Sequence, residues 1–214
     1  MREHQPAVET AVKSKPRQRK PAPKASASGT GRLRIIGGQW RGRKLDFAEA
    51  DGLRPTGDRI RETLFNWLQA DLPGAHCLDL FSGSGALGLE ALSRDAGSAL
   101  LLEKNAAAAR CIQANLQLLN DQHGQVVHTD TLSHLSQTAP TAYNVVFLDP
   151  PFALNLWQQV IALLETNGWL AEHAAIYIET PKNLPLNIPS HWQLHRQKHS
   201  GQVSYSLYYR QSNL

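Results

Sequence analysis

With 214 residues and a mass of 23.7 kDa, the chain has room for one domain of ordinary size and a small appendage, which excludes a large modular enzyme. Hydrophobic residues make up 42% of the sequence, and no apolar run approaches the roughly 20 residues that cross a bilayer, so we expect a soluble protein without a membrane partner. Cys77 and Cys111 have neither a paired spacing nor a histidine cluster nearby, which predicts no disulfide, no metal site and a reducing cytoplasm.

The positive charge is concentrated at the N-terminus. Residues 1–34 hold nine of the 22 Lys and Arg residues against two Glu residues, a net charge of +7, which leaves −3 for the rest of a chain of net charge +4. Residues 1–32 are too polar to bury a core and are predicted to form a disordered basic tail. Two interpretations of this tail stay open: a solubilising segment, or an arm that attracts polyanions such as RNA.

One ordered domain is predicted over residues 33–214. It begins with two short strands around the turn at Gly37 and Gly38. Thr56 is then predicted to be the N-cap of an amphipathic helix over about 57–70, because apolar residues recur there at helical spacing.

From His76 onward, short apolar runs alternate with helical stretches. The runs predict buried strands over 77–81, 99–102, 126–127, 145–148 and 174–178. The stretches between them predict helices over 86–94, 106–119, 132–137 and 156–165, with Asn105 capping the second of these. After Pro185 the pattern changes, and 193–199 and 203–210 are predicted to form an antiparallel pair. The alternation predicts an α/β fold with a mostly parallel sheet and helices on both faces.

The first of these strands runs into a glycine-rich loop, Asp79-Leu80-Phe81-Ser82-Gly83-Ser84-Gly85-Ala86-Leu87-Gly88. The three glycines have the spacing that lets a backbone approach a nucleotide closely, which is a weak signal by itself. Glu103 lies 20 residues after Gly83, at the end of the next strand, where a carboxylate can accept both hydroxyls of a ribose. Together, the loop and Glu103 indicate an adenosine-containing cofactor.

Asp79 discriminates between such cofactors. Its carboxylate would repel the pyrophosphate of a dinucleotide, whereas it could anchor the ammonium group of S-adenosyl-L-methionine. A structural role, in which Asp79 satisfies backbone groups of the loop, is the alternative. Asp130 could accept from the adenine amino group, cap the following helix, or do both. The predicted cofactor-binding residues are Asp79, Phe81, Gly83, Gly85, Glu103, Asp130, Thr131 and Leu132.

The fourth strand ends in the tetrad Asp149-Pro150-Pro151-Phe152. An exocyclic amine of a nucleobase is a poor nucleophile, because its lone pair is delocalised into the ring, and acceptors at the Asp149 carboxylate and the Pro150 carbonyl can localise it. Phe152 can stack on a base that has been turned out of its helix. A rigid loop with Asp149 as a helix cap is the alternative. Ligands of open α/β sheets bind beyond the carboxyl ends of the strands, so we expect the tetrad and the glycine loop at one edge.

These motifs resemble those of the class I S-adenosylmethionine-dependent methyltransferases that carry an (N/D)-P-P-(Y/F/W) tetrad and methylate exocyclic amines. Residues 33–45, Arg54-Pro55-Thr56 with 58–66, 79–85 and 147–152 together are similar to the RsmD family. The resemblance implies a Rossmann-like class I methyltransferase fold, with a mostly parallel seven-stranded sheet whose last two strands form a hairpin. It also implies S-adenosyl-L-methionine as the cofactor, and methylation of a guanine N2 amine in bacterial small-subunit (16S) ribosomal RNA. Phe152 departs from the Tyr common in the family: stacking survives this change, whereas a contact from a Tyr hydroxyl would not.

The resemblance implies that the N-terminal hairpin, over 33–47, contacts RNA. Trp40 lies among arginines there, a pattern that suits phosphate contact and base stacking.

Arg59 and Arg61 could contact RNA or pair with carboxylates on their own helix, and this stays open. Trp157 is predicted to pack in the core, because it lies at helical spacing with apolar residues. The predicted RNA-binding residues are Arg34, Trp40, Arg41, Arg43, Lys44, Arg54 and Arg59.

The expected catalytic residues are therefore Asp149, Pro150 and Phe152, and the expected partner is 16S rRNA in a small-subunit assembly particle, bound by a monomer. An adenine-N6 or protein-glutamine methyltransferase would use the same tetrad chemistry. A non-catalytic RNA-binding assembly factor is a rival of a different class, which the presence of Asp79 and Glu103 argues against. An oxidoreductase is suggested by the glycine spacing alone.

Overall fold

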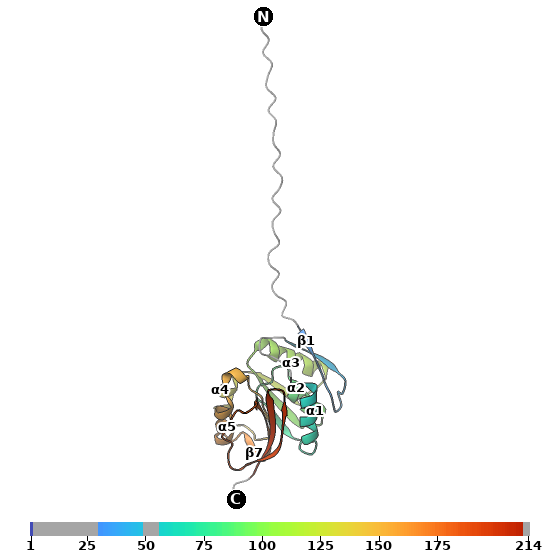
Figure 1. Ribbon diagram of the computed structural model, residues 1–214. Coiled ribbons are helices and arrows are strands. Elements are labelled where there is room, and N and C mark those ends of the chain that lie inside the picture. The colour runs from blue at the N-terminus through green and yellow to red at the C-terminus, as the bar shows by residue number, and fades with distance from the viewer. Residues whose placement is uncertain (2–29, 49–55, 212–214) are drawn as a thin grey trace.

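The computed structural model describes residues 1, 30–48 and 56–211 (Figure 1). Most of the predicted tail, 1–32, lies outside the described residues, although the first strand begins at Thr30, three residues before the expected start of the domain. The strands are β1 (Thr30–Arg34), β2 (Lys44–Ala48), β3 (His76–Asp79), β4 (Ser98–Glu103), β5 (Gly124–His128), β6 (Tyr143–Leu148), β7 (Leu170–Pro181), β8 (Trp192–Ser200) and β9 (Val203–Arg210). The helices are α1 (Asp58–Trp67), α2 (Ala86–Ser93), α3 (Ala106–Leu118), α4 (Thr131–Leu135), the 3₁₀ turn η1 (Phe152–Leu154) and α5 (Trp157–Thr166).

The central sheet has seven strands in the order β5-β4-β3-β6-β7-β9-β8. Strands β3 to β7 pair in parallel, and β9 is antiparallel to both β7 and β8. The carboxyl ends of β3 to β7 therefore meet at one edge, which we call the carboxyl edge. The mostly parallel seven-stranded sheet and its final hairpin are confirmed, because every predicted strand after residue 76 is present.

Helices cover both faces of this sheet, as predicted. Figure 1 shows α4 and α5 on one side and α1, α2 and α3 on the other. Each side has its own core: Phe65, Leu89 and Ile112 are among the residues packed on the α1–α3 face. Trp157 is fully buried on the α4–α5 face, so its predicted packing role is confirmed. Asn105 caps α3, its side chain accepting from two backbone N–H groups of the first turn at 2.9 and 3.1 Å.

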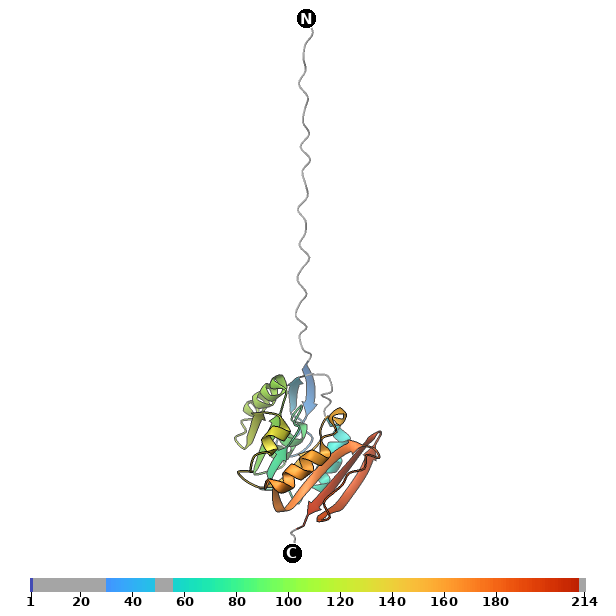
Figure 2. The ribbon, with the colours of Figure 1, turned by 90° about the vertical axis from the view of Figure 1, so that its left-hand side faces the viewer.

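The small sheet β1–β2 packs beside α3. Figure 2 shows this hairpin, in blue, next to the green helix α3 and at the opposite end of the protein from β8 and β9. The side chain of Asn115 on α3 donates to the backbone carbonyl of Asp46 on β2 at 2.8 Å, which fixes the hairpin to the domain.

The hairpin differs from its prediction at the connection between its strands. The second strand begins at Lys44, because the chain turns at Gly38 (φ +71°) and Gly42 (φ +85°) and folds back on the end of α2. Trp40 is only 9% exposed, and its backbone N–H donates to the Ser93 hydroxyl at 3.0 Å. The expectation that Trp40 stacks on RNA is therefore wrong: the indole is packed in the core, where it anchors the connection.

Thr56 also differs from its prediction. Helix α1 begins at Asp58 and its N-cap is Gly57, without a side-chain capping bond, so Thr56 is not the cap. Among the described residues, no helix is long and apolar enough to cross a membrane.

Candidate active site

The glycine-rich loop connects β3 to α2 through two residues with positive φ. Gly83 (φ +54°) and Gly85 (φ +78°) adopt the left-handed region, which side chains other than glycine rarely enter. Gly88, in the first turn of α2, packs against β4, and a Cβ atom there would lie 2.5 Å from the Leu101 side chain. The sequence spacing of the glycines is thus explained by a tight turn and by close packing of helix on strand.

Asp79 lies at the carboxyl end of β3 and is 3% exposed. The backbone N–H of Gly88 donates to its Oδ2 at 3.0 Å, so Asp79 does satisfy a backbone group of the loop. Burial raises the pKa of Asp79 to about 7, a hydrogen bond from Gly88 opposes this, and the charge of Glu103 adds to it. A buried carboxyl of this kind gains most from a cationic partner, which the ammonium of an amino acid would supply.

Glu103 ends β4 beside the same loop and is 8% exposed. Its Oε2 accepts from the backbone N–H of Gly83 at 2.6 Å, and its Oε1 accepts from that of Asn105 at 2.6 Å. Each carboxylate oxygen has a second lone pair, so Glu103 can hold the loop and still accept from ribose hydroxyls.

Asp130 caps α4, as one of its two predicted roles requires: Oδ1 accepts from the backbone N–H of Ser133 at 3.1 Å. The Lys104 ammonium donates to Oδ2 at 3.0 Å, and this bond lowers the pKa of Asp130. Thr131 is buried, and its hydroxyl donates to the Leu80 carbonyl at 2.5 Å, which ties α4 to the loop after β3. The two remaining residues of the predicted cofactor set pack partly on the α4–α5 core, and they are Phe81 and Leu132.

The tetrad leaves the sheet at the end of β6. Asp149 is half-buried, and its Oδ2 accepts from the Thr56 hydroxyl at 3.4 Å. Pro150 is buried, whereas Phe152 is 37% exposed at the start of η1, with its ring 5.7 Å from that of Trp157. Phe152 is thus among the few large apolar side chains of the described residues that face solvent, as a platform for a base requires.

The two motifs meet at the carboxyl edge because β3 and β6 are neighbours in the sheet. Asp79 is paired with Phe147, two residues before Asp149, and the backbone N–H of Leu80 donates to the Phe147 carbonyl at 3.2 Å. Burial raises the pKa of Asp149 well above its usual value, and the nearby charges of Glu179 and Asp79 raise it further. The carboxyl groups of Asp79 and Asp149, both with a raised pKa, therefore lie close together at the carboxyl edge.

Glu179, which the sequence analysis missed, completes this acidic cluster. It lies near the end of β7, is 5% exposed, and accepts from the Tyr177 hydroxyl at 2.7 Å. Its backbone carbonyl accepts from the Trp157 indole N–H at 2.7 Å. Burial raises the pKa of Glu179 as well. The signal was present in the sequence, since Glu179 directly follows the predicted strand 174–178, as Asp149 follows its own strand.

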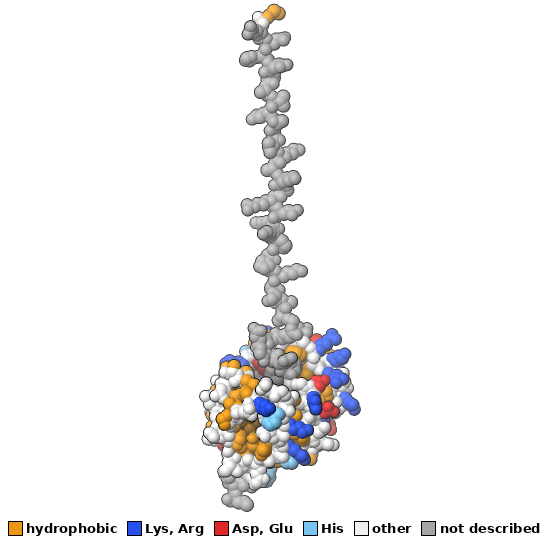
Figure 3. Space-filling model, in the orientation of Figure 1, with side chains coloured by type: hydrophobic (Ala, Val, Ile, Leu, Met, Phe, Trp, Pro, Cys, Tyr) orange, Lys and Arg blue, Asp and Glu red, His pale blue; other side chains and the backbone are white. Residues whose placement is uncertain are grey.

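The predicted RNA-binding cations that the structure describes divide into two groups. Arg34 pairs with Asp58 at 3.3 Å, and Arg43 donates to the Leu118 carbonyl at 3.3 Å. Three others are exposed and form no ion pair within the described residues; they are Arg41, Lys44 and Arg59. Arg54 lies outside the described residues. Figure 3 shows Lys and Arg side chains gathered, with some acidic ones, along the right-hand edge over the hairpin and α1.

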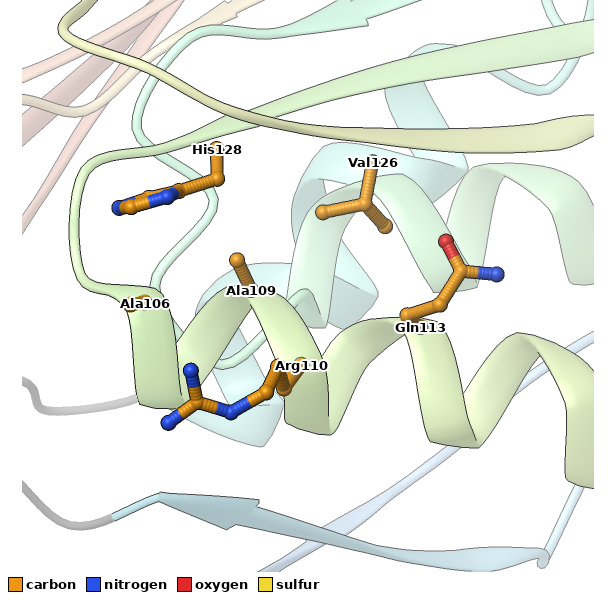
Figure 4. Close-up of a pocket in the computed structure, with 6 residues that line it drawn as sticks. All are labelled: Ala106, Ala109, Arg110, Gln113, Val126 and His128. Carbon is orange, nitrogen blue, oxygen red and sulfur yellow. The ribbon is translucent and has the colours of Figure 1, made fainter.

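A cavity of about 220 Å³ lies between α3 and the edge strand β5 (Figure 4). It is lined by Ala106, Ala109, Arg110, Gln113, Val126 and His128, none of which belongs to the loop or the tetrad. The converging carboxyl groups at the carboxyl edge, and not this open hollow, form the candidate site.

Comparison with known proteins identifies relatives over most of the chain. The family model described as conserved hypothetical protein 95 matches residues 33–209. The ribosomal RNA small subunit methyltransferase D of Escherichia coli is 51% identical over 191 residues, covering 88% of this chain and 96% of that protein. The protein of the same name from Haemophilus influenzae is 48% identical, covering 83% of this chain and 94% of that protein. A solved structure of the E. coli protein yhhF, described as a methyltransferase, matches with a TM-score of 0.79 and 51% identity, over 86% of this chain and 100% of that one.

Proposed function

Because the chain belongs to the RsmD family of methyltransferases, and has its Rossmann-like class I fold, we propose that it methylates the N2 amine of a guanine in small-subunit ribosomal RNA. The methyl donor in this proposal is S-adenosyl-L-methionine, and the protein acts in the bacterial cytoplasm. The observation that carries the proposal is the approach of Asp149 to Asp79 at the carboxyl edge.

The residues of the glycine loop fit S-adenosyl-L-methionine. Gly83 and Gly85 present backbone without side chains, Asp79 offers a buried carboxyl to an ammonium group, and Glu103 offers acceptors to a ribose. Asp130 lies two residues after β5, as the N-cap of α4, where the adenine amine could donate to it. When bound, this cofactor supplies a methyl group that its sulfonium charge activates for transfer.

The tetrad residues would prepare the amine. The Asp149 carboxylate and the Pro150 carbonyl accept its two hydrogens, which localises the nitrogen lone pair and aims it. Phe152 stacks on the extruded base and keeps it out of its helix. A methylated amine that becomes cationic loses its proton readily, so Asp149 orients the amine and stabilises developing positive charge without acting as a strong base.

The hairpin and the start of α1 would bind the surrounding RNA. Exposed Arg41, Lys44 and Arg59 suit contacts to phosphates, and Arg34 and Arg43 can add to these from the same side. An interaction with a small-subunit assembly particle, by a monomer of this protein, completes the proposal.

The test is transfer of a labelled methyl group from S-adenosyl-L-methionine to small-subunit particles and to naked rRNA, under single-turnover conditions. Asp149→Ala is expected to lower the rate by about 100-fold or more, while the affinity for S-adenosylhomocysteine stays unchanged. Glu172→Ala, on the exposed part of β7, is the matched control. Digestion of the product should give N2-methylguanosine; label in adenosine or in glutamine, or undiminished transfer by Asp149→Ala, would refute the proposal.

A further inference from the structure

Thr56 contacts the tetrad from a distant part of the chain. It lies two residues before α1, and its hydroxyl donates to Asp149 Oδ2 across 93 positions of sequence. Since Gly57 caps α1 without any side-chain bond, helix capping does not explain a hydroxyl at this position. The same hydroxyl also lies against the buried Glu179, so it sits between the carboxyl groups of Asp149 and Glu179.

Arg61 fixes Thr56 in this place. Its Nε donates to the Thr56 carbonyl at 3.2 Å, and the side chain is fully buried. The other nitrogens of the guanidinium bind the Arg34 carbonyl at 2.9 Å, Asp58 at 2.6 Å and Glu90 at 3.3 Å. The question of whether Arg61 contacts RNA is thereby answered, because its donors are used inside the protein.

This arrangement joins three elements to the tetrad. Arg34 belongs to the hairpin, Asp58 to α1, and Glu90 to α2, the helix that follows the glycine loop. Burying a guanidinium and a carboxylate is costly unless both are well paired, and replacing them by apolar residues often costs nothing. Unlike an apolar core, the polar network around Arg61 places the Thr56 hydroxyl beside Asp149.

The charged groups around Asp149 indicate what the Thr56 hydroxyl does there. The acids that face Asp149 are Glu179 on β7 and Asp79 on β3, and both disfavour its ionised form. Tyr177 donates to Glu179 and not to Asp149. Among the described side chains, Thr56 alone donates to Asp149, and this bond lowers its pKa against burial and the neighbouring charges.

We propose that Thr56 is a positioning residue of the reaction: its hydroxyl holds Oδ2 of Asp149 so that Oδ1 meets the amine, while Arg61 fixes Thr56. This inference rests on the proposed function, since it needs Asp149 to bind the amine. It assigns a chemical role to Thr56, whose hydroxyl helix capping does not explain.

The test compares Thr56→Val and Thr56→Ala, which lack the hydroxyl, with Thr56→Ser, which keeps it. Single-turnover methyl transfer at saturating RNA and cofactor is measured from pH 5.5 to 9. Both hydroxyl-free variants are expected to be about tenfold slower at neutral pH, because they lose a hydrogen bond to a charged group, and to have the acid limb of their profile moved to higher pH. Thr56→Ser should restore both the rate and the profile.

The outcomes separate the inference from the function on which it rests. If Asp149→Ala abolishes transfer but Thr56→Val and Thr56→Ala keep the wild-type rate and pH profile, the proposed function stands and the inference is overturned. A slower rate with an unmoved acid limb, weaker binding of S-adenosylhomocysteine, or failure of Thr56→Ser to restore activity would indicate a merely structural role and also overturn it. If Asp149→Ala retains methyl transfer, both the proposed function and the inference about Thr56 are overturned.

Discussion

Replacing Asp79 by asparagine should make the ligand-free protein more stable at neutral and alkaline pH. Burial raises the pKa of Asp79 from 3.8 to about 7, against an opposing hydrogen bond from Gly88 and with a further rise from the charge of Glu103. Between about pH 4 and pH 7, the folded protein therefore keeps the Asp79 proton, whereas the unfolded chain releases it. Wild-type stability consequently falls as the pH rises from about 4 to 7, because the unfolded state binds fewer protons.

The size of the effect follows from the two pKa values. At 1.36 kcal/mol for each pH unit, a rise from 3.8 to about 7 means that ionised Asp79 costs the folded protein about 4 kcal/mol at pH 8. In Asp79→Asn, the amide oxygen can still accept from the Gly88 N–H, but the buried NH₂ group lacks an assigned acceptor, which costs about 2 kcal/mol. The expected net gain is about 2 kcal/mol at pH 8 and close to zero at pH 5.

Urea unfolding of the ligand-free proteins at the two pH values measures this gain. Asp95→Asn is the control, because Asp95 is exposed and has a positive φ of 69° that asparagine adopts readily. A stability difference between wild type and Asp79→Asn that is the same at pH 5 and pH 8 would refute the reasoning. S-adenosylhomocysteine should then stabilise wild type more than Asp79→Asn, because an amide cannot pair with an ammonium charge.

Two further predictions concern the hairpin. Gly38→Ala should destabilise the protein by about 3 kcal/mol or more, because a Cβ atom there would lie 1.6 Å from the Ser93 carbonyl oxygen and φ is +71°. Gly42→Ala, where φ is +85° but a Cβ atom meets nothing within 4 Å, should cost only about 1 kcal/mol in urea unfolding, and equal losses would contradict the close approach. Combining Arg41→Gln with Lys44→Gln should reduce the slope of log RNA affinity against log salt by about 1 for each phosphate that the protein no longer neutralises, whereas an unchanged slope would remove both from the RNA interface.

The sequence alone was sufficient to predict the layers of the fold and the two motifs at the carboxyl edge. Apolar runs of strand length alternate with helical periods, and this pattern depends only on local spacing, so β3 to β7 and their helices were found within a few residues of their ends. The capping roles of Asn105 and Asp130 were also local, since each side chain binds the N–H groups of its own first turn.

What only the tertiary structure decided is which side chains meet. Trp40 turns into the core because Gly38 lets its connection fold back onto α2, and no pattern of nearby residues indicates this. Glu179 joins Asp149 because β7 is the parallel neighbour of β6 in one particular register, and Thr56 reaches the same carboxyl because a buried Arg61 holds it there. Helices and strands follow from interactions between residues a few positions apart, whereas the acidic cluster depends on contacts across up to 93 positions, which form only when the whole sheet is assembled.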